Sequence, residues 1–191
     1  MQKLIVPEQF EAHQSRGALS PTLERAMITL CARPSPYRIE ALALDSGAPT
    51  SLAELVKKLS LPVWDVLYPG YLSAADTDRL EGFRVPVDSA NSEETIWSSP
   101  EANYLFRAWH DATHYNLGAE LDIDGERAVA EAQCRFFTGT NREILWAETF
   151  GQVEYFKRWG VFPKWQRDFV RDAVGFGIDR TVGGGDYHDV K

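Results

Sequence analysis

The clearest periodic pattern in the chain runs from Ser99 to Leu117. Steps of three and four residues place polar side chains on one stripe and apolar side chains on the opposite side, a spacing that predicts an α-helix. Ser99 is a good N-cap, and Pro100 suits the first helical position, where a backbone N–H has no intrahelical partner. The polar members of the stripe, which form either a solvent face or the wall of a polar pocket, are Asn103, Arg107, His110 and His114.

Three further helices are predicted after this one. The first begins at Asp122 or Asp124 as N-cap and continues to Phe137. The next covers residues 142–159 and ends before Gly160, a residue suited to a helix C-terminus. It is apolar on nearly every side, which indicates burial. The last begins at Pro163 and extends to residue 176.

The pattern before residue 99 is less regular. It predicts two short helices, one over residues 21–32 and one over residues 51–59. Residues 37–44 fit a strand or a short helix, with alternation favouring the strand. Residues 83–87 fit an edge strand, because Pro86 has no N–H to donate to a ladder. Residues 61–72 predict a loop or packed turn rich in aromatic side chains.

These elements predict a mainly α protein. Its C-terminal part is an assembly of about four helices, and its irregular N-terminal part adds one or two short strands. We divide the chain into an N-terminal region (1–98), a helical core carrying the candidate site (99–178) and a flexible tail (179–191).

Composition narrows the functional classes. The chain has 191 residues, enough for one domain with a full core, and its apolar and charged contents are ordinary for a globular protein. The net charge of −8 disfavours a broad nucleic-acid-binding surface and a membrane-surface role. Two distant cysteines define no disulfide framework, and no apolar run has the length of a signal peptide or membrane span. A cytoplasmic location is therefore expected.

The candidate chemistry begins with His110 and His114. Two histidines four residues apart project from one helix face about one turn apart, the spacing that lets two imidazoles share a metal ion. A third ligand is expected from the next helix, which offers Glu126 and Glu131. Glu131 stands in a four-residue repeat with two arginines, typical of a solvated face. Glu126 shares its stripe with small and apolar residues, so we prefer Glu126 as the ligand.

Three further side chains are catalytic candidates. Glu148 falls within the apolar helix, where a buried carboxylate needs a cation or a donor, so it is a second candidate ligand. Arg107, on the histidine stripe, is expected to pair with Glu148 or to bind an anionic substrate. Asp111, next to His110, either acts as an acid or base, or orients a histidine.

Two local resemblances bear on the chemistry. The string His110-Asp111-Ala112-Thr113-His114 resembles the His-Glu-x-x-His helix of zincin metallohydrolases, with Asp in place of Glu. That resemblance implies a zinc ion on the histidines and an acid that activates water. The dipeptide His110-Asp111 also resembles the core of the HD phosphohydrolases, which bind metal through His…His-Asp…Asp in an all-helical fold. In this chain the last ligand of that pattern would be Asp168 or Asp172, and the helical upstream histidine is missing.

The sequence thus favours a metal-dependent hydrolase acting on an amide, ester or phosphoester in a small-molecule or peptide substrate. Zinc is the preferred ion, with manganese or iron as alternatives. A second hypothesis is a non-catalytic structural or protein-interaction protein with a buried His/Glu/Arg network. The aromatic region within 61–98 would then contact a protein partner or a second copy. An HD-like phosphohydrolase is the third hypothesis.

Overall fold

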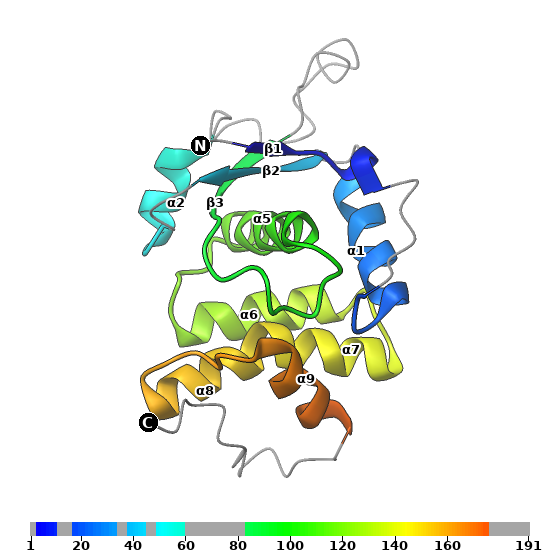
Figure 1. Cartoon of the computed structure of the whole chain (residues 1–191). Helices are drawn as coiled ribbons and strands as arrows, with labels where there is room; N and C mark the ends of the chain where they lie inside the picture. Colours follow the sequence, from blue (N-terminus) through cyan, green and yellow to red (C-terminus); the bar gives the residue numbers. More distant parts are fainter. Residues whose placement is uncertain (1–2, 11–16, 34–37, 45–48, 60–82, 176–191) are drawn as a thin grey trace.

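A computed structural model describes residues 3–10, 17–33, 38–44, 49–59 and 83–175. The protein is mainly α, with one small sheet near the N-terminus. The sheet lies at one end of the molecule, a single long helix lies beneath it, and the remaining C-terminal helices form the other end (Figure 1). The predicted fold class is therefore confirmed.

The sheet has three strands in the order β1-β2-β3. The strands are β1 (Lys3–Ile5), β2 (Ile39–Leu44) and β3 (Phe83–Asp88). β1 pairs with β2 in antiparallel orientation, and β3 pairs with β2 in parallel, with Leu42 opposite Pro86. β3 thus lies at an edge of the described sheet, as Pro86 predicts. The ambiguity at residues 37–44 is resolved as a strand.

Two helices flank the sheet. They are α1 (Pro21–Ala32) and α2 (Leu52–Lys58), and a 3₁₀ turn, η1 (Pro7–Phe10), follows β1. The Ser20 side chain caps α1 by accepting from the N–H of Leu23, and Ser51 caps α2 by accepting from the N–H of Glu54. Both helices were predicted, and α2 is one residue shorter at each end than the predicted range 51–59. Residues 60–82, including the whole predicted aromatic loop, and residues 176–191, including the predicted tail, lie outside the described residues.

Helix α5 (Pro100–Leu117) connects the two ends of the molecule. Ser99 accepts from the N–H of Ala102 at its start, and Gly118 ends it in the left-handed conformation with φ 62°. One side of α5 packs on the sheet and α2, while another packs on α1 and the C-terminal helices. Both hydrophobic clusters therefore contain residues from before and after residue 98.

The C-terminal helices are α6 (Ile123–Cys134), α7 (Gly139–Trp146), η3 (Ala147–Gly151), α8 (Gln152–Trp159) and α9 (Gln166–Gly175). Helix α6 ends earlier than predicted, because the N–H groups of Phe136 and Phe137 bond three residues back and tighten the last turn. The predicted helix over 142–159 begins at Gly139 and contains η3, a π-helical turn. Helix α9 begins three residues after Pro163.

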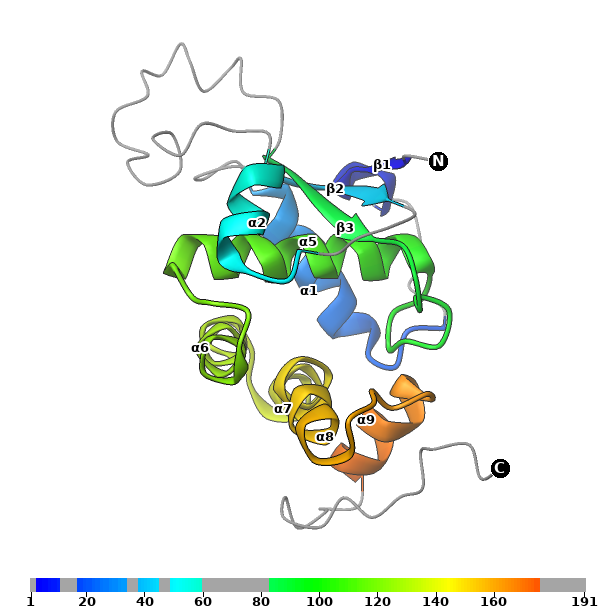
Figure 2. The same cartoon turned by 90° about the vertical axis from the view of Figure 1, so that its left-hand side faces the viewer.

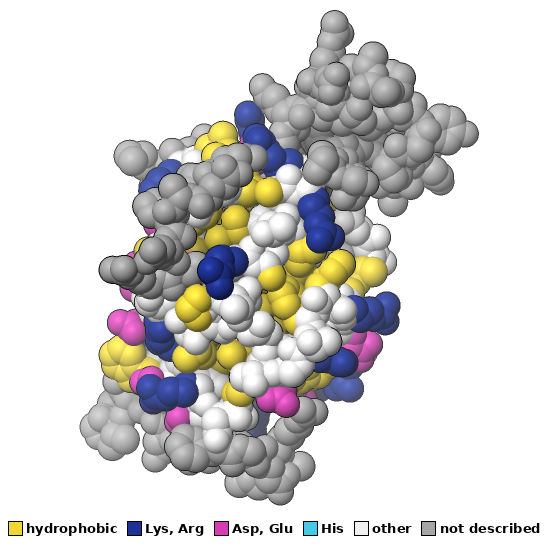
Figure 3. All heavy atoms as spheres, turned by 90° about the vertical axis from the view of Figure 1, so that its right-hand side faces the viewer, with side chains coloured by type: hydrophobic (Ala, Val, Ile, Leu, Met, Phe, Trp, Pro, Cys, Tyr) yellow, Lys and Arg dark blue, Asp and Glu magenta, His cyan; other side chains and the backbone are white. Residues whose placement is uncertain are grey.

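Figure 2 shows α6, α7 and α8 stacked away from the sheet, with α5 between the two layers. Figure 3 shows the face that lies on the right of Figure 1, where no histidine side chain is visible among the described residues. In the described part of the chain, no helix combines the length and hydropathy needed to cross a bilayer.

Candidate metal centre

His110 and His114 lie on successive turns of α5 and face the same point. Their Nε2 atoms are 3.2 Å apart, and the ring planes meet at 72°. His114 is fully buried, while the side chain of His110 is 17% exposed. The helical spacing therefore produces the convergence that the sequence predicts.

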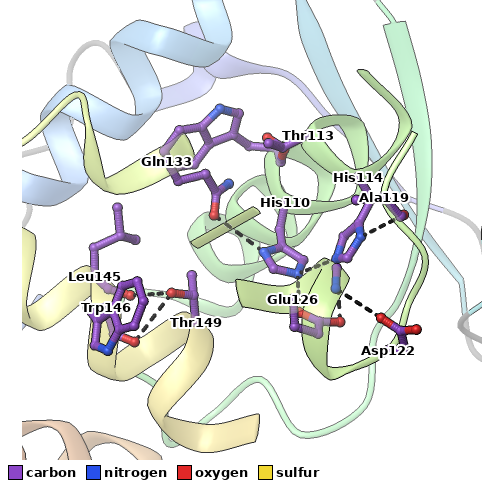
Figure 4. Close-up of polar contacts among 12 residues, drawn as sticks. His110, Thr113, His114, Ala119, Asp122, Glu126, Gln133, Leu145, Trp146 and Thr149 are labelled. Carbon is purple, nitrogen blue, oxygen red and sulfur yellow. Dashed lines mark hydrogen bonds and ion pairs between the residues drawn. The ribbon is translucent and has the colours of Figure 1, made fainter. Parts of the chain in front are cut away.

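Glu126 on α6 completes the cluster. Its Oε2 atom lies 3.0 Å from Nε2 of His110, and its Oε1 atom lies 3.4 Å from Nε2 of His114 (Figure 4). Within the described residues, these three side chains form the group whose ligand atoms converge closely enough to share a metal ion. Glu131, the rejected alternative, is exposed on the other side of α6.

The first turn of α6 positions Glu126. Asp122 caps the helix by accepting from the N–H of Gly125 at 2.9 Å. A Cβ atom on Gly125 would lie 1.8 Å from the backbone oxygen of Glu120, so only glycine lets the chain pass here. The residue that follows this close contact is Glu126.

The outer nitrogen of each imidazole has an acceptor. Nδ1 of His114 lies 3.1 Å from the carbonyl oxygen of Ala119, which can only accept, so this nitrogen carries a proton. Nδ1 of His110 lies 3.3 Å from Oε1 of Gln133 on α6. Such partners fix the tautomer of metal-binding histidines and direct the Nε2 lone pairs inward. No role for Gln133 was predicted from the sequence. Its place seven residues after Glu126, on the same helical stripe, could have indicated that it lies near the histidines.

Glu126 and His110 favour each other's charged forms. Burial alone would raise the pKa of Glu126, but hydrogen bonds and charge from the two histidines outweigh it and hold this pKa well below its usual range. For His110, burial favours the neutral ring, yet the hydrogen bond and charge of Glu126 outweigh burial and raise its pKa. The carboxylate thus favours a positive charge on His110.

A pocket of about 540 Å³ opens beside the cluster and is lined by His110 and Glu126. Asp111, Arg107 and Glu148, the other candidates from the sequence, line the same pocket. Burial raises the pKa of Asp111 to about 6, although the neighbouring histidines oppose it. The structure therefore brings all six predicted site residues to one region, five of them in the pocket wall and His114 buried behind it.

Glu148 stands in the π-helical turn η3 and is 6% exposed. Its Oε2 atom accepts from the Gln152 amide at 2.7 Å. Burial raises the pKa of Glu148 to about 8, opposed by the charge of Arg107 and the bond from Gln152. Figure 4 shows the next residue of this turn, Thr149, whose hydroxyl donates to the carbonyl of Leu145 at 2.7 Å. π-turns inside α-helices often occur at functional sites.

The direct hydrogen bonds of Arg107 go to backbone carbonyls and not to Glu148, while its binding of an anionic substrate stays a prediction. Its guanidinium donates to the backbone carbonyls of Asp88 and Ala90 at 2.7 and 2.8 Å, and to that of Asn91 at 3.2 Å. These bonds hold the segment after β3 as one wall of the pocket. Burial lowers the pKa of Arg107, and the charges of Asp88, Glu148 and Asp111 offset this only in part.

The aspartates that an HD-like site requires lie elsewhere. Asp168 and Asp172 are on α9, where both pair with Arg171 on the same helix. Neither belongs to the described metal-binding cluster or lines the pocket. His13 and His188 lie outside the described residues.

Comparisons with known proteins give no further assignment. No protein-family model matches the chain, and neither a curated protein nor a solved structure matches it significantly.

Proposed function

We propose that this protein is a metal-dependent hydrolase in which His110, His114 and Glu126 bind one divalent ion. The observation that carries the proposal is the convergence of two imidazole Nε2 atoms and one carboxylate within 3.0 to 3.4 Å of each other. Two nitrogens and one oxygen of this kind suit zinc best, with manganese or iron as alternatives.

The positions of the protons on the two imidazole rings support a cation between their Nε2 atoms and Glu126. The carbonyl of Ala119 keeps the proton of His114 on Nδ1, so Nε2 of the neutral ring is an acceptor. The same tautomer of His110 turns a second acceptor toward the same point, and Glu126 adds carboxylate oxygens. Acceptor atoms facing one another repel unless a positive charge lies between them. A metal ion supplies that charge to all three groups at once.

The pocket supports catalysis over a closed structural site. Three protein ligands leave a tetrahedral ion one open position, which is the arrangement of catalytic zinc. When bound, such an ion supplies Lewis acidity and activates water at neutral pH. Asp111 and Glu148 line the adjoining pocket as candidate proton acceptors or donors, and Arg107 holds its wall. The substrate class is an amide, ester or phosphoester of a small molecule or peptide.

A second candidate function, a non-catalytic protein with a buried polar network, also has an observation in its favour. The 3.0 Å distance between His110 Nε2 and Glu126 suits an ordinary charged hydrogen bond if His110 is protonated. In that case the cluster would stabilise the packing of α5 on α6 without a metal. Metal content distinguishes the two functions.

The test is elemental analysis by mass spectrometry of untagged protein, with titration of zinc, manganese and iron into chelator-treated samples. We expect about one equivalent of metal in the wild type, lost in His110→Ala and Glu126→Ala. Glu131→Ala is the matched control, because it removes an exposed carboxylate from the same helix. It should retain the metal.

The outcomes separate cleanly. Absence of metal, together with no thermal stabilisation by any of the three ions, would refute the metalloenzyme and favour the polar network. A stoichiometric metal directs the second step, an activity screen with chromogenic esters, amides and phosphoesters. In that screen Asp111→Asn should lower turnover while metal content stays at one equivalent.

A further inference from the structure

Helix α8 and the segment that follows it lie at the end of the molecule opposite the sheet (Figure 2). Five large apolar side chains there, within ten residues, are 43–52% exposed: Phe156, Trp159, Val161, Phe162 and Trp165. The other exposed large apolar side chains of the described residues, Leu4, Leu117 and Phe136, are separated along the chain. We call residues 156–165 the aromatic turn. An apolar group of this density marks a contact surface.

The aromatic turn is basic in an acidic protein. No aspartate or glutamate occurs in residues 156–167, although the chain as a whole carries a net charge of −8. Lys157, Arg158 and Lys164 are exposed among the apolar side chains. Arg167 is excluded from this surface, because it donates to the backbone oxygen of Gly17. These exposed cations therefore favour a partner with negative charge.

Four rings on this surface each have a stacked ring or a cation over one face. Phe156 and Phe162 stack on each other with centroids 4.7 Å apart. The guanidinium of Arg158 lies 5.1 Å from the Trp159 ring centre, and the ammonium of Lys164 lies 5.2 Å from that of Trp165. Single-stranded nucleic acids bind by stacking bases on open aromatic faces, and the face of each ring that already has a neighbour is not open to a base. Tryptophan beside lysine or arginine is instead typical of side chains that anchor proteins at a lipid–water interface.

The local backbone presents the apolar residues at a turn. Helix α8 ends at Gly160, whose φ of 73° lies in the left-handed region that favours glycine. Val161 and Phe162 follow directly, and Pro163 is buried. The exposed pair is thus flanked by Trp159 on one side and Lys164 and Trp165 on the other.

We propose that the aromatic turn docks the protein on an anionic lipid bilayer, with Val161 and Phe162 entering the interface and Lys157, Arg158 and Lys164 contacting lipid phosphates. The net charge predicts no membrane role, but salt screens charges beyond roughly 8 Å under physiological conditions, so the local cations dominate at contact. Phe162 and Lys164 also line the pocket, so the bilayer would lie at its mouth. The proposal does not depend on metal binding.

The test is co-sedimentation of the full chain with vesicles of phosphatidylcholine alone or with added phosphatidylserine. We expect binding only to the vesicles that contain phosphatidylserine, weakening as salt is raised. The double variant Val161→Ser/Phe162→Ser should weaken binding by roughly tenfold or more, since both apolar contacts are lost. Lys157→Ala/Lys164→Ala should also weaken it. The matched control, Leu117→Ser/Phe136→Ser, changes two exposed apolar side chains elsewhere and should bind as the wild type does.

Thermal unfolding of each variant establishes that the fold is retained, and any variant that has unfolded is replaced by Val161→Ser alone. The proposal would be overturned by no binding to either vesicle, by equal binding to both, by binding that the turn variants leave unchanged, or by retention of single-stranded DNA in place of vesicles. Light scattering that shows a dimer abolished by Val161→Ser/Phe162→Ser would also overturn it, because a second copy would then occupy this surface.

Discussion

The Nε2 atoms of His110 and His114 lie 3.2 Å apart, while the Nδ1 atom of each ring faces an acceptor on a neighbouring segment. With protons on both Nδ1 atoms, neither inner nitrogen of the neutral rings can donate to the other. The pair is therefore stabilised by a positive charge, which is either a metal ion between the rings or a proton on Nε2 of His110 that Glu126 accepts. This requirement connects the helical spacing of two residues to the proposed metal chemistry.

The acceptor behind His110 should matter for metal affinity. Gln133→Leu fills a similar volume with an apolar side chain but removes the oxygen that faces Nδ1 of His110. We expect metal binding to weaken about 10- to 100-fold, because the ring loses the partner that fixes its orientation. Competition with a chromophoric chelator measures this, with Glu131→Leu as the surface control. Unchanged affinity would show that Gln133 does not orient the ring.

The close contact at the start of α6 should not tolerate a side chain. In Gly125→Ala the added Cβ would overlap the backbone oxygen of Glu120, so the first turn and Glu126 must shift. We expect a loss of roughly 2–4 kcal/mol in unfolding free energy and weaker metal binding. Gly175→Ala is the control, because open space surrounds that position on α9. Denaturant unfolding compares the two, and equal stability would contradict the structure here.

The start of α5 is anchored by a buried carboxylate on α1. Glu24 is 1% exposed and accepts from the N–H and the hydroxyl of Ser98, both at 2.7 Å. Glu24→Leu leaves these donors without their acceptor and should cost about 1–3 kcal/mol. Denaturant titration measures the loss. Glu131→Leu, an exposed position, should change stability by less than about 0.5 kcal/mol.

Glu148 should make the metal-free protein less stable as pH rises. Its pKa is near its usual value when unfolded but is raised to about 8 by burial in the fold, so the unfolded chain loses this proton first. Between about pH 4.5 and 8 the unfolded state binds fewer protons, and the folding free energy contributed by this group falls. The upper limit is about 4 kcal/mol across the three pH units from 5 to 8.

Glu148→Gln removes this titration while keeping a polar side chain of similar size. Its stability relative to the wild type should therefore rise from pH 5 to pH 8, measured by denaturant unfolding of chelator-treated protein. Glu131→Gln controls for the loss of one charge at an exposed site. A stability difference that stays flat with pH would mean that Glu148 is already ionised in the fold.

Much of the fold was predictable because its signals are local. Side-chain caps at Ser20, Ser51, Ser99 and Asp122 mark helix starts in the sequence, and each makes its capping bond in the structure. The later start of α9 had no such signal, since the first-turn N–H of Arg167 is satisfied by the carbonyl of Glu94 from a distant loop. The π-turn η3 was likewise not predicted, because the helix is apolar on nearly every side and a shift of its stripe by one inserted residue leaves no visible break in the pattern.

The sequence by itself determined that His110 and His114 share a helix face, because four residues are about one helical turn. It also determined that Glu126, and not Glu131, turns inward, because the two lie on stripes of different polarity. Only the tertiary structure decided that α6 crosses α5 where Glu126 meets both rings, and that Gln133 and the carbonyl of Ala119 lie behind them. Those contacts depend on how separate helices pack, and periodicity within one helix carries no information on the position of another.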